Sequence, residues 1–159
     1  MRSTQVAYAG LMPGSDYLET LSVADWTLRW QGILANEANA TFVAEDESRI
    51  VGFAGIGSGL NRDGLGADIG EVRVIYVDPG HWRRGVGSAL MDAAESRLAE
   101  DYSGAILWVL EANDRARRFY ESRGWSPDGA TKQLDGTQLL EVRYARSLAA
   151  KVDPQGTPA

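Results

Sequence analysis

The sequence contains no cysteine and only one histidine among its 159 residues. The lack of cysteine excludes disulfide bonds, thiolate metal sites and a cysteine nucleophile, and it fits a reducing cytoplasm. With one histidine, a histidine-based cluster is not expected either, so we expect no metal. No run of 18 apolar residues occurs, so no membrane-spanning helix is expected. No apolar segment follows Met1–Gln5, so no secretory signal is indicated and the expected location is the cytoplasm.

Positive charge is scarce: 16 lysines and arginines stand against 22 aspartates and glutamates, which gives a net charge of −6 at pH 7. This balance disfavours a nucleic-acid partner and mildly favours cationic ones. The length suits one domain with a real core and is too short for two. We therefore expect a single domain over residues 1–147 and a flexible tail over 148–159, a segment rich in Pro, Gly and polar residues.

What the sequence does contain is a strand, a turn and a helix start at residues 74–91. The apolar run Val74–Val77 predicts a buried strand, which Asp78-Pro79-Gly80 ends. The turn at Arg83–Ser88 leads into a helix expected from Arg84 to about Asp101. Turn glycines let backbone N–H groups approach an anion, and the helix start adds its unpaired donors. Two adjacent arginines favour a pyrophosphate over a single carboxylate.

Two common phosphate-binding motifs do not match this turn. A P-loop needs Lys after its second glycine, and none follows here; a dinucleotide-binding loop needs a third glycine where Leu90 stands. What remains is R-R-G-x-G-[SA]-x-L after a strand ending in V-D-P. A second motif follows: the strand Leu107–Leu110, then Asn113, then a helix with the pattern F-Y-E-x-x-G-W at Phe119–Trp125. In this order the two motifs resemble the acyl-CoA site of the GNAT superfamily of N-acetyltransferases.

The resemblance covers about residues 41–147 and only part of the first forty. It implies an α/β (α+β) fold, with a mixed, mostly antiparallel sheet and helices on both faces. The expected elements are a helix at 22–35, a hairpin at 41–46 and 49–56, strands at 72–77 and 105–111, a helix at 114–123, and strands at 125–134 and 139–146. The family's first strand has no counterpart in the pattern. An uncovered sheet edge invites pairing with another chain, so a homodimer is one expectation.

The resemblance also implies how acetyl-CoA, as co-substrate, would be held. The strands at 72–77 and 105–111 would part at one end, with the pantetheine arm between them. Ile75 and Val77 would pair with pantetheine through main-chain groups, and a main-chain N–H near Ile75-Tyr76 would face the developing oxyanion. The pyrophosphate would be held by Arg83, Arg84, Gly85, Val86, Gly87 and Ser88.

Three further residues are implied in cofactor binding or chemistry. Asn113 would hydrogen-bond the cofactor, cap the following helix, or do both. Tyr120 would contact the cofactor and, as general acid, protonate the departing thiolate; core packing beside Phe119 is the alternative. Glu71 matches a position that many relatives use as a base, often through water, and a solvated strand-end carboxylate is the alternative. Glu111 is a weaker candidate that would only pair with arginines.

Other residues depart from the family pattern or carry little signal. Trp82 stands where the family has Gln or Arg, which predicts an altered cofactor affinity. Trp108 stands where some protein N-terminal acetyltransferases have Glu, which argues against their mechanism. His81 is interpreted as a turn filler, and Asp63 and Asp68 as solvated residues or acceptor contacts. The acidic outer face of the helix after the turn is interpreted as surface, and the tryptophans of the 22–35 helix as core or as a wall of the acceptor pocket.

The expected reaction is transfer of acetyl from acetyl-CoA to a primary amine of a small molecule or peptide, by direct attack in a ternary complex. The alternative, from another class, is a catalytically weak acyl-CoA-binding sensor or assembly module of the same fold. Tyr120, Asn113 and the loop glycines favour the enzyme, and the missing first strand favours the alternative. No pattern identifies the amine.

Overall fold

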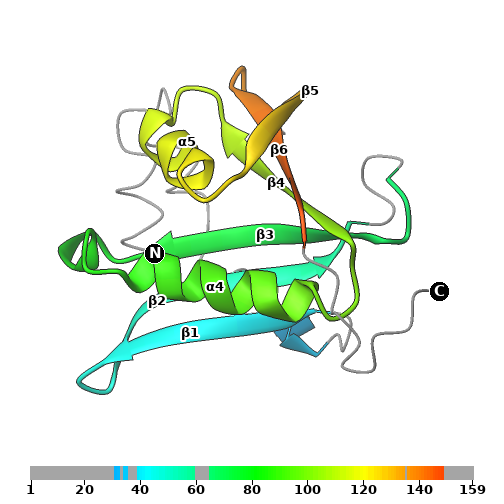
Figure 1. The fold of residues 1–159 in the computed structure, drawn as a ribbon. Helices are drawn as coiled ribbons and strands as arrows, with labels where there is room; N and C mark the ends of the chain where they lie inside the picture. Colours follow the sequence, from blue (N-terminus) through cyan, green and yellow to red (C-terminus); the bar gives the residue numbers. More distant parts are fainter. Residues whose placement is uncertain (1–30, 33, 36–38, 60–64, 135, 149–159) are drawn as a thin grey trace.

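The computed structural model describes residues 31–32, 34–35, 39–59, 65–134 and 136–148. Over these residues six strands form one sheet, in the order β1-β2-β3-β4-β6-β5 (Figure 1). The strands are β1 (Ala40–Asp46), β2 (Arg49–Ser58), β3 (Ile69–Val77), β4 (Gly104–Leu110), β5 (Ser126–Gln133) and β6 (Leu140–Ser147). The helices are the short 3-10 turn η1 (Pro79–His81), α4 (Val86–Leu98) and α5 (Asp114–Glu121). The mixed sheet with its helices confirms the predicted fold class.

Among the described strands, β3 and β4 are the one parallel pair, and all other neighbours are antiparallel. Parallel strands need a crossover connection, which α4 provides. The predicted β1–β2 hairpin is confirmed. Its turn residues Glu47 and Ser48 have φ values of 46° and 65°, which match the two left-handed positions of a type I′ turn.

The helix after the glycine-rich turn begins two residues later than predicted. Arg83 and Gly85 have φ values of 61° and 82°, and this left-handed conformation cannot belong to a right-handed helix. Glycine adopts it without a Cβ penalty, so position 85 suits the turn. At its other end α4 stops at Leu98 instead of continuing to about Asp101. The connection between the strands predicted at 49–56 and 72–77 is also shorter at both ends, since β2 continues through Ser58 and β3 starts at Ile69.

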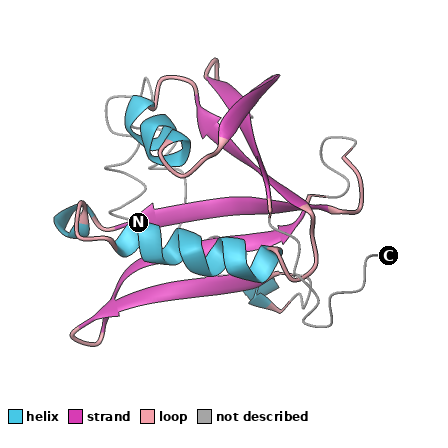
Figure 2. Cartoon of the chain, viewed as in Figure 1, coloured by secondary structure: helices cyan, strands magenta, loops and turns pink. Residues whose placement is uncertain are grey.

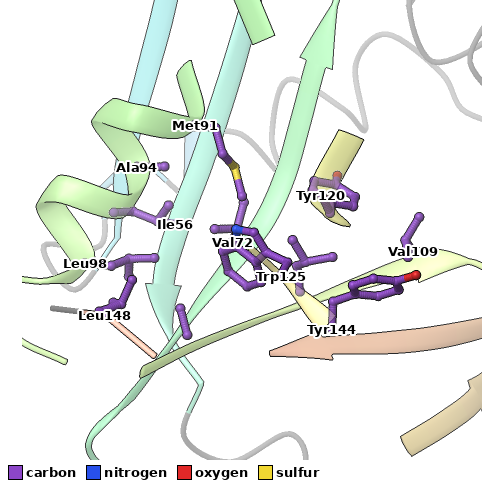
Figure 3. Packing of buried hydrophobic residues seen from close by; sticks show 12 residues of the cluster. Ile56, Val72, Met91, Ala94, Leu98, Val109, Tyr120, Trp125, Tyr144 and Leu148 are labelled. Carbon is purple, nitrogen blue, oxygen red and sulfur yellow. The ribbon is translucent and has the colours of Figure 1, made fainter. Parts of the chain in front are cut away.

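Helices α4 and α5 lie on the same face of the sheet (Figure 2), so these two do not confirm the expectation of helices on both faces. Met91, Ala94 and Leu98 from α4 and Tyr120 from α5 join one buried cluster with Val72 of β3 (Figure 3). Other strands contribute Ile56, Ala105, Leu107, Val109 and Tyr144, and Trp125 and Leu148 complete the cluster. Packing on this face fixes the positions of α4 and α5 relative to β3 and β4. The site is formed by these four elements together.

The predictions for the amino-terminal part fall mostly outside the described residues. Of the helix expected at 22–35, the structure describes a helical stretch at Gln31, Gly32 and Leu34, where Ala35 N–H donates to Gln31 C=O at 3.0 Å. The expected absence of a first strand, the tryptophans of that helix and Asp63 lie outside the described residues. The domain bounds at 1–147 and the tail remain predictions.

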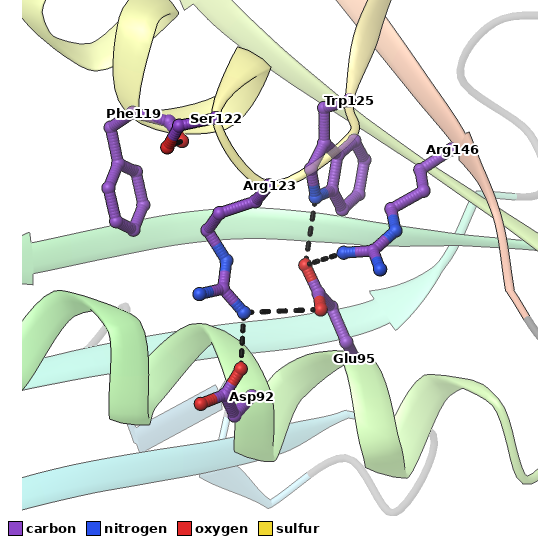
Figure 4. Close-up of polar contacts among 7 residues, drawn as sticks. All are labelled: Asp92, Glu95, Phe119, Ser122, Arg123, Trp125 and Arg146. Carbon is purple, nitrogen blue, oxygen red and sulfur yellow. Dashed lines mark hydrogen bonds and ion pairs between the residues drawn. The ribbon is translucent and has the colours of Figure 1, made fainter.

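A polar junction joins α4 to the segment after α5 (Figure 4). The Glu95 carboxylate accepts from Trp125 Nε1 at 2.9 Å and contacts an Arg146 guanidinium nitrogen at 2.7 Å. Arg123 also reaches Glu95, at 3.3 Å, and forms an ion pair with Asp92. Interpretation of the acidic face as surface was therefore wrong for Glu95, whose side chain is only 12% exposed. The chain following α5 folds back over that part of α4.

No helix within the described residues is long and apolar enough to span a membrane. Within the same residues, no group of three or more His, Cys, Asp or Glu side chains is placed to hold a metal ion.

Candidate active site

The site lies where β3 and β4 separate. Their parallel pairing runs from Ile69–Gly104 to Val72–Leu107 and then stops. At the same point β3 carries a bulge on its other side: Val72 pairs with Ile56 and Val74 with Gly55, so Arg73 is left over. A bulge bends the strand that carries it, which turns the rest of β3 away from β4. The resulting cleft has a volume of about 910 Å³.

Main-chain groups of β3 face into this cleft. Asp78 N–H donates to Val51 C=O of β2 at 2.7 Å, and backbone direction alternates along a strand. The main-chain groups of Tyr76 therefore also face β2. Consistent with this, a Cβ atom added to Gly52 of β2 would lie 2.8 Å from the Tyr76 carbonyl oxygen. Ile75 and Val77 face the opposite way, toward the cleft. An extended ligand can pair with them there as another strand would.

The far end of the cleft is built to hold an anion. The amino terminus of α4 has no side-chain cap, so the N–H groups of its first turn are available to a ligand. Gly87 has no side chain at this place: a Cβ atom there would be in van der Waals contact with Phe119 and Val77, 3.7 Å from each. Among the described residues, the cleft is lined by four arginines, Arg73, Arg83, Arg115 and Arg118, and by no aspartate or glutamate. In a protein of net charge −6, this concentrates positive charge at one place.

Tyr120 and Asn113 both lie in the cleft wall. Asn113 Oδ1 accepts from Ala116 N–H at 3.2 Å, so its predicted capping role is confirmed. Tyr120 is 7% exposed, and its ring packs edge-on against Phe119 with centroids 5.5 Å apart. Because Tyr120 also belongs to the buried cluster, it both packs in the core and lines the cleft.

Behind Tyr120, Tyr144 of β6 is held by two side chains of α5. Its hydroxyl donates to Glu121 at 2.6 Å and accepts from Arg117 Nε at 3.1 Å. Burial, reinforced by the bond to Glu121, raises the pKa of Tyr144 above its usual value. Because the Tyr120 and Tyr144 rings lie 6.3 Å apart, this network fixes the surface on which Tyr120 rests.

Glu71 does not line the cleft. It is 4% exposed, which overturns the alternative of a solvated strand-end carboxylate. Its Oε2 lies 3.4 Å from Arg73 Nε but accepts no hydrogen bond from the described residues. Arg73 does line the cleft, and it also donates to Asn39 at 2.6 Å and to the Ser58 carbonyl at 3.0 Å. Glu71 is thus a buried carboxylate one residue removed from the cleft wall.

Of the cofactor residues predicted from sequence, the cleft brings together Ile75, Tyr76, Val77, Arg83, Gly85, Gly87, Ser88, Asn113 and Tyr120. Arg84 and Val86 belong to the same turn but are not in its lining. Sequence reasoning missed Arg73, Arg115, Arg118 and Phe119 as cleft residues. A signal existed for two of them, because Arg115 and Arg118 are three apart on a predicted helix and so share a face.

Three minor interpretations are settled by contacts. His81 is not a turn filler, because its ring nitrogens lie 2.9 Å from Asp78 and 3.3 Å from Asp46. These contacts join the end of β1 to the turn before the anion site. The Asp68 carboxylate accepts from Ser103 Oγ at 2.8 Å and supports the start of β4. Glu111 meets an arginine through its carbonyl, which accepts from Arg117 at 3.1 Å.

Comparisons with known proteins agree with this geometry. The family model described as Acetyltransferase (GNAT) family matches residues 10–125, and the chain belongs to this family. A mycothiol acetyltransferase of Acidimicrobium ferrooxidans is 35% identical over 111 residues, which are 65% of this chain and 34% of the relative. An uncharacterized N-acetyltransferase of Archaeoglobus fulgidus is 33% identical over 92 residues, which are 57% of this chain and 63% of the relative. The chain thus spans about a third of the length of the first relative and somewhat under two thirds of the length of the second.

The fold has a solved counterpart in the PaiA N-acetyltransferase of Thermoplasma acidophilum, whose structure is a complex with coenzyme A. The TM-score is 0.69 at 18% sequence identity, over 92% of this chain and 86% of that one. At this identity the likeness concerns the fold.

Proposed function

We propose that the protein transfers the acetyl group of acetyl-CoA to a primary amine, which attacks the thioester directly in a ternary complex. The observation that carries this proposal is the cleft between β3 and β4, with main-chain groups along one wall and an anion site at its end. The donor set fits coenzyme A, since an extended amide-containing arm and a pyrophosphate need these two surfaces. The co-substrate suggests a cytoplasmic location.

In this arrangement the pyrophosphate is held by the first-turn N–H groups of α4, with Arg83 and Arg84 beside them. The pantetheine arm pairs with Ile75 and Val77. The N–H that faces the thioester oxygen is that of Ile75, because Tyr76 is turned toward β2. A main-chain donor at that place stabilises the negative charge that develops on the oxygen during attack.

The chemistry requires three proton transfers. An alkylammonium with a pKa near 10 must lose a proton before it attacks. We assign this proton to Glu71, through water, since Glu71 is buried close to the cleft without lining it. The nitrogen then attacks the carbonyl carbon and the C–N bond forms. As the C–S bond breaks, the nitrogen loses its second proton to solvent and the amide results. The thiolate leaves and takes the proton of the Tyr120 hydroxyl, and solvent reprotonates the tyrosine.

The acceptor class is a primary amine on a small molecule or peptide. The mycothiol acetyltransferases among the relatives support an acyltransferase, but the chain matches only a part of them. Acetyl-CoA should therefore be offered with a panel of polyamines, amino sugars, aminoglycosides and peptides with free amino groups. The expected result is CoA release with an acetylated amine identified by mass spectrometry. CoA binding without turnover on any amine would instead favour the sensor or assembly module.

The same assay tests Glu71. Glu71→Gln removes the base and keeps the side chain's size, so kcat/KM should fall at neutral pH by roughly 10²-fold or more. The deficit should shrink toward about pH 10, where the amine deprotonates unaided. Asp68→Asn is the matched control, because that carboxylate supports β4 and lies outside the cleft lining. A deficit that stays constant across the pH range would contradict the assignment of Glu71 as base.

A further inference from the structure

Trp82 lies at the anion end of the cleft and is fixed from two sides. Its Nε1 donates to Val77 C=O at 2.9 Å, which holds the indole across the turn that it belongs to. The guanidinium carbon of Arg115 lies over its ring, 3.6 Å from the ring centroid. Trp82 comes from the turn after β3 and Arg115 from the first turn of α5, so this stack joins the two elements that enclose the anion site.

Arg115 has no carboxylate partner among the described residues, and its side chain is exposed. Other arginines of this acidic protein do have partners: Arg123, Arg143 and Arg146 each lie against Asp or Glu. Stacking on an aromatic ring uses the flat face of a guanidinium and leaves its N–H donors free at the edge. Arg115 is therefore held in place while its hydrogen-bonding edge is open to the cleft.

Trp82 has neither a cationic nor an amide group to offer a ligand. Its single side-chain donor, the indole N–H, already donates to Val77 C=O. A guanidinium stands directly over the Trp82 ring. We infer that Arg115, supported by Trp82, is a diphosphate-binding residue, which supplies from α5 the charged contact that the turn lacks at residue 82. This inference rests on the proposed use of acetyl-CoA and assigns a contact to α5 in addition to the α4 helix start.

Two consequences follow for binding. Arg115 contributes through charge-assisted hydrogen bonds to phosphate, which are among the stronger ones in proteins. Trp82 contributes by positioning: without the ring, Arg115 loses its support and must be ordered when the ligand binds. The effects of the two residues on affinity should therefore be coupled rather than additive.

The test measures dissociation constants by calorimetry, with the full chain and without turnover. Arg115→Gln should weaken CoA roughly tenfold to a hundredfold, the range expected for a lost charged hydrogen bond. 3′-Dephospho-CoA keeps the diphosphate, so it should be weakened by the same factor. Arg97→Gln is the matched control, because Arg97, near the end of α4, forms an exposed ion pair with Asp101, and neither residue lines the cleft. It should bind CoA as the unmodified protein does.

The double-mutant cycle with Trp82→Leu tests the support. In the Trp82→Leu background, Arg115→Gln should reduce CoA affinity by a clearly smaller factor than in the unmodified protein. Equal factors in the two backgrounds would overturn the support by Trp82. Unfolding curves without ligand show whether Trp82→Leu is folded, and Trp82→Met, which also lacks the ring, replaces it if not. Unchanged CoA affinity in Arg115→Gln would overturn the assignment, and a loss for CoA but not for dephospho-CoA would overturn the choice of phosphate. Failure of the unmodified protein to bind CoA would instead overturn the proposed function.

Discussion

At the scale of single residues, Tyr120 combines two roles that sequence reasoning had to treat as alternatives. It belongs to the buried cluster, and it also forms part of the cleft wall. Its position at the edge of the core means that the ring is fixed by neighbours on one side. A fixed ring is an advantage for a proton donor, because the hydroxyl need not be ordered when substrate binds.

Tyr120→Phe separates these roles, because it keeps the ring and deletes the hydroxyl. We expect kcat to fall roughly 10²–10⁴-fold, the range typical of a positioned general acid, with CoA affinity nearly unchanged. Steady-state rates and calorimetric CoA binding on the same preparations measure the two effects. Tyr102→Phe, which deletes a hydroxyl outside the cleft lining, serves as control. Near-normal kcat would return Tyr120 to a packing role alone.

The sequence could predict Tyr120 and Asn113 because each stands at a fixed place in a local motif. It could not predict the Trp82–Arg115 stack, since the two residues are 33 positions apart and meet only through the packing of α5 on the turn. The sequence showed that residue 82 departs from the family pattern. Which residue compensates depends on tertiary geometry, which no local pattern contains.

At the scale of elements, the hydrophobic periodicity of the sequence predicts the order and type of the helices and strands. Where each element begins and ends depends on the backbone geometry of the fold. The pattern of residues 72–77 predicts a strand, and the structure adds a bulge at Arg73 where pairing with β4 ends. A bulge depends on the register of two partner strands, so one strand's residues do not reveal it. The start of α4 at Val86 likewise depends on the left-handed conformation of Gly85, which a helical apolar pattern does not show.

The contact of α5 with β6 gives a prediction at this scale. Tyr144→Phe removes the hydroxyl that joins Glu121 and Arg117, so the free energy of unfolding should fall by about 1 kcal/mol near neutral pH. The raised pKa of Tyr144 means that the folded protein keeps this proton where the unfolded chain releases it. Its stabilisation is therefore complete below about pH 10 and declines as pH rises further.

Urea unfolding at several pH values measures this dependence. The difference in stability between the unmodified protein and Tyr144→Phe should be constant up to about pH 10 and should narrow above it. Tyr102→Phe corrects for general alkaline effects, because no described residue hydrogen-bonds to the Tyr102 hydroxyl. A difference that widens with increasing pH would contradict the direction of the pKa shift.

At the scale of the whole molecule, an acidic protein presents a cleft whose charged lining is basic. The net charge of −6 shows that the protein is acidic, but it does not predict a basic cleft. Composition sums over the chain, whereas the fold gathers Arg73, Arg83, Arg115 and Arg118 from β3, the turn and α5. A polyanionic co-substrate is therefore compatible with an acidic chain, because the local field and not the total charge decides binding.

Binding at this cleft should stabilise the entire fold, since the site exists only when β3, β4 and the starts of α4 and α5 are folded together. With free CoA at about 100 times its dissociation constant, the native state gains about 2.7 kcal/mol, and the melting temperature should rise by roughly 5–10 °C. Gly87→Glu places a carboxylate in the cleft lining at the first turn of α4, where phosphate would bind. Repulsion there should abolish most of the shift.

Ala89→Glu is the matched control for charge: it adds the same group two residues along α4, at an exposed position outside the cleft lining. Because it also places a negative charge near a helix start, it should leave α4 no less stable. Differential scanning fluorimetry with and without CoA then compares three proteins. The expected order is a full shift for the unmodified chain, nearly the same for Ala89→Glu, and little or none for Gly87→Glu. Equal shifts in the two glutamate variants would mean that the phosphates bind elsewhere, because only one of those carboxylates points into the cleft.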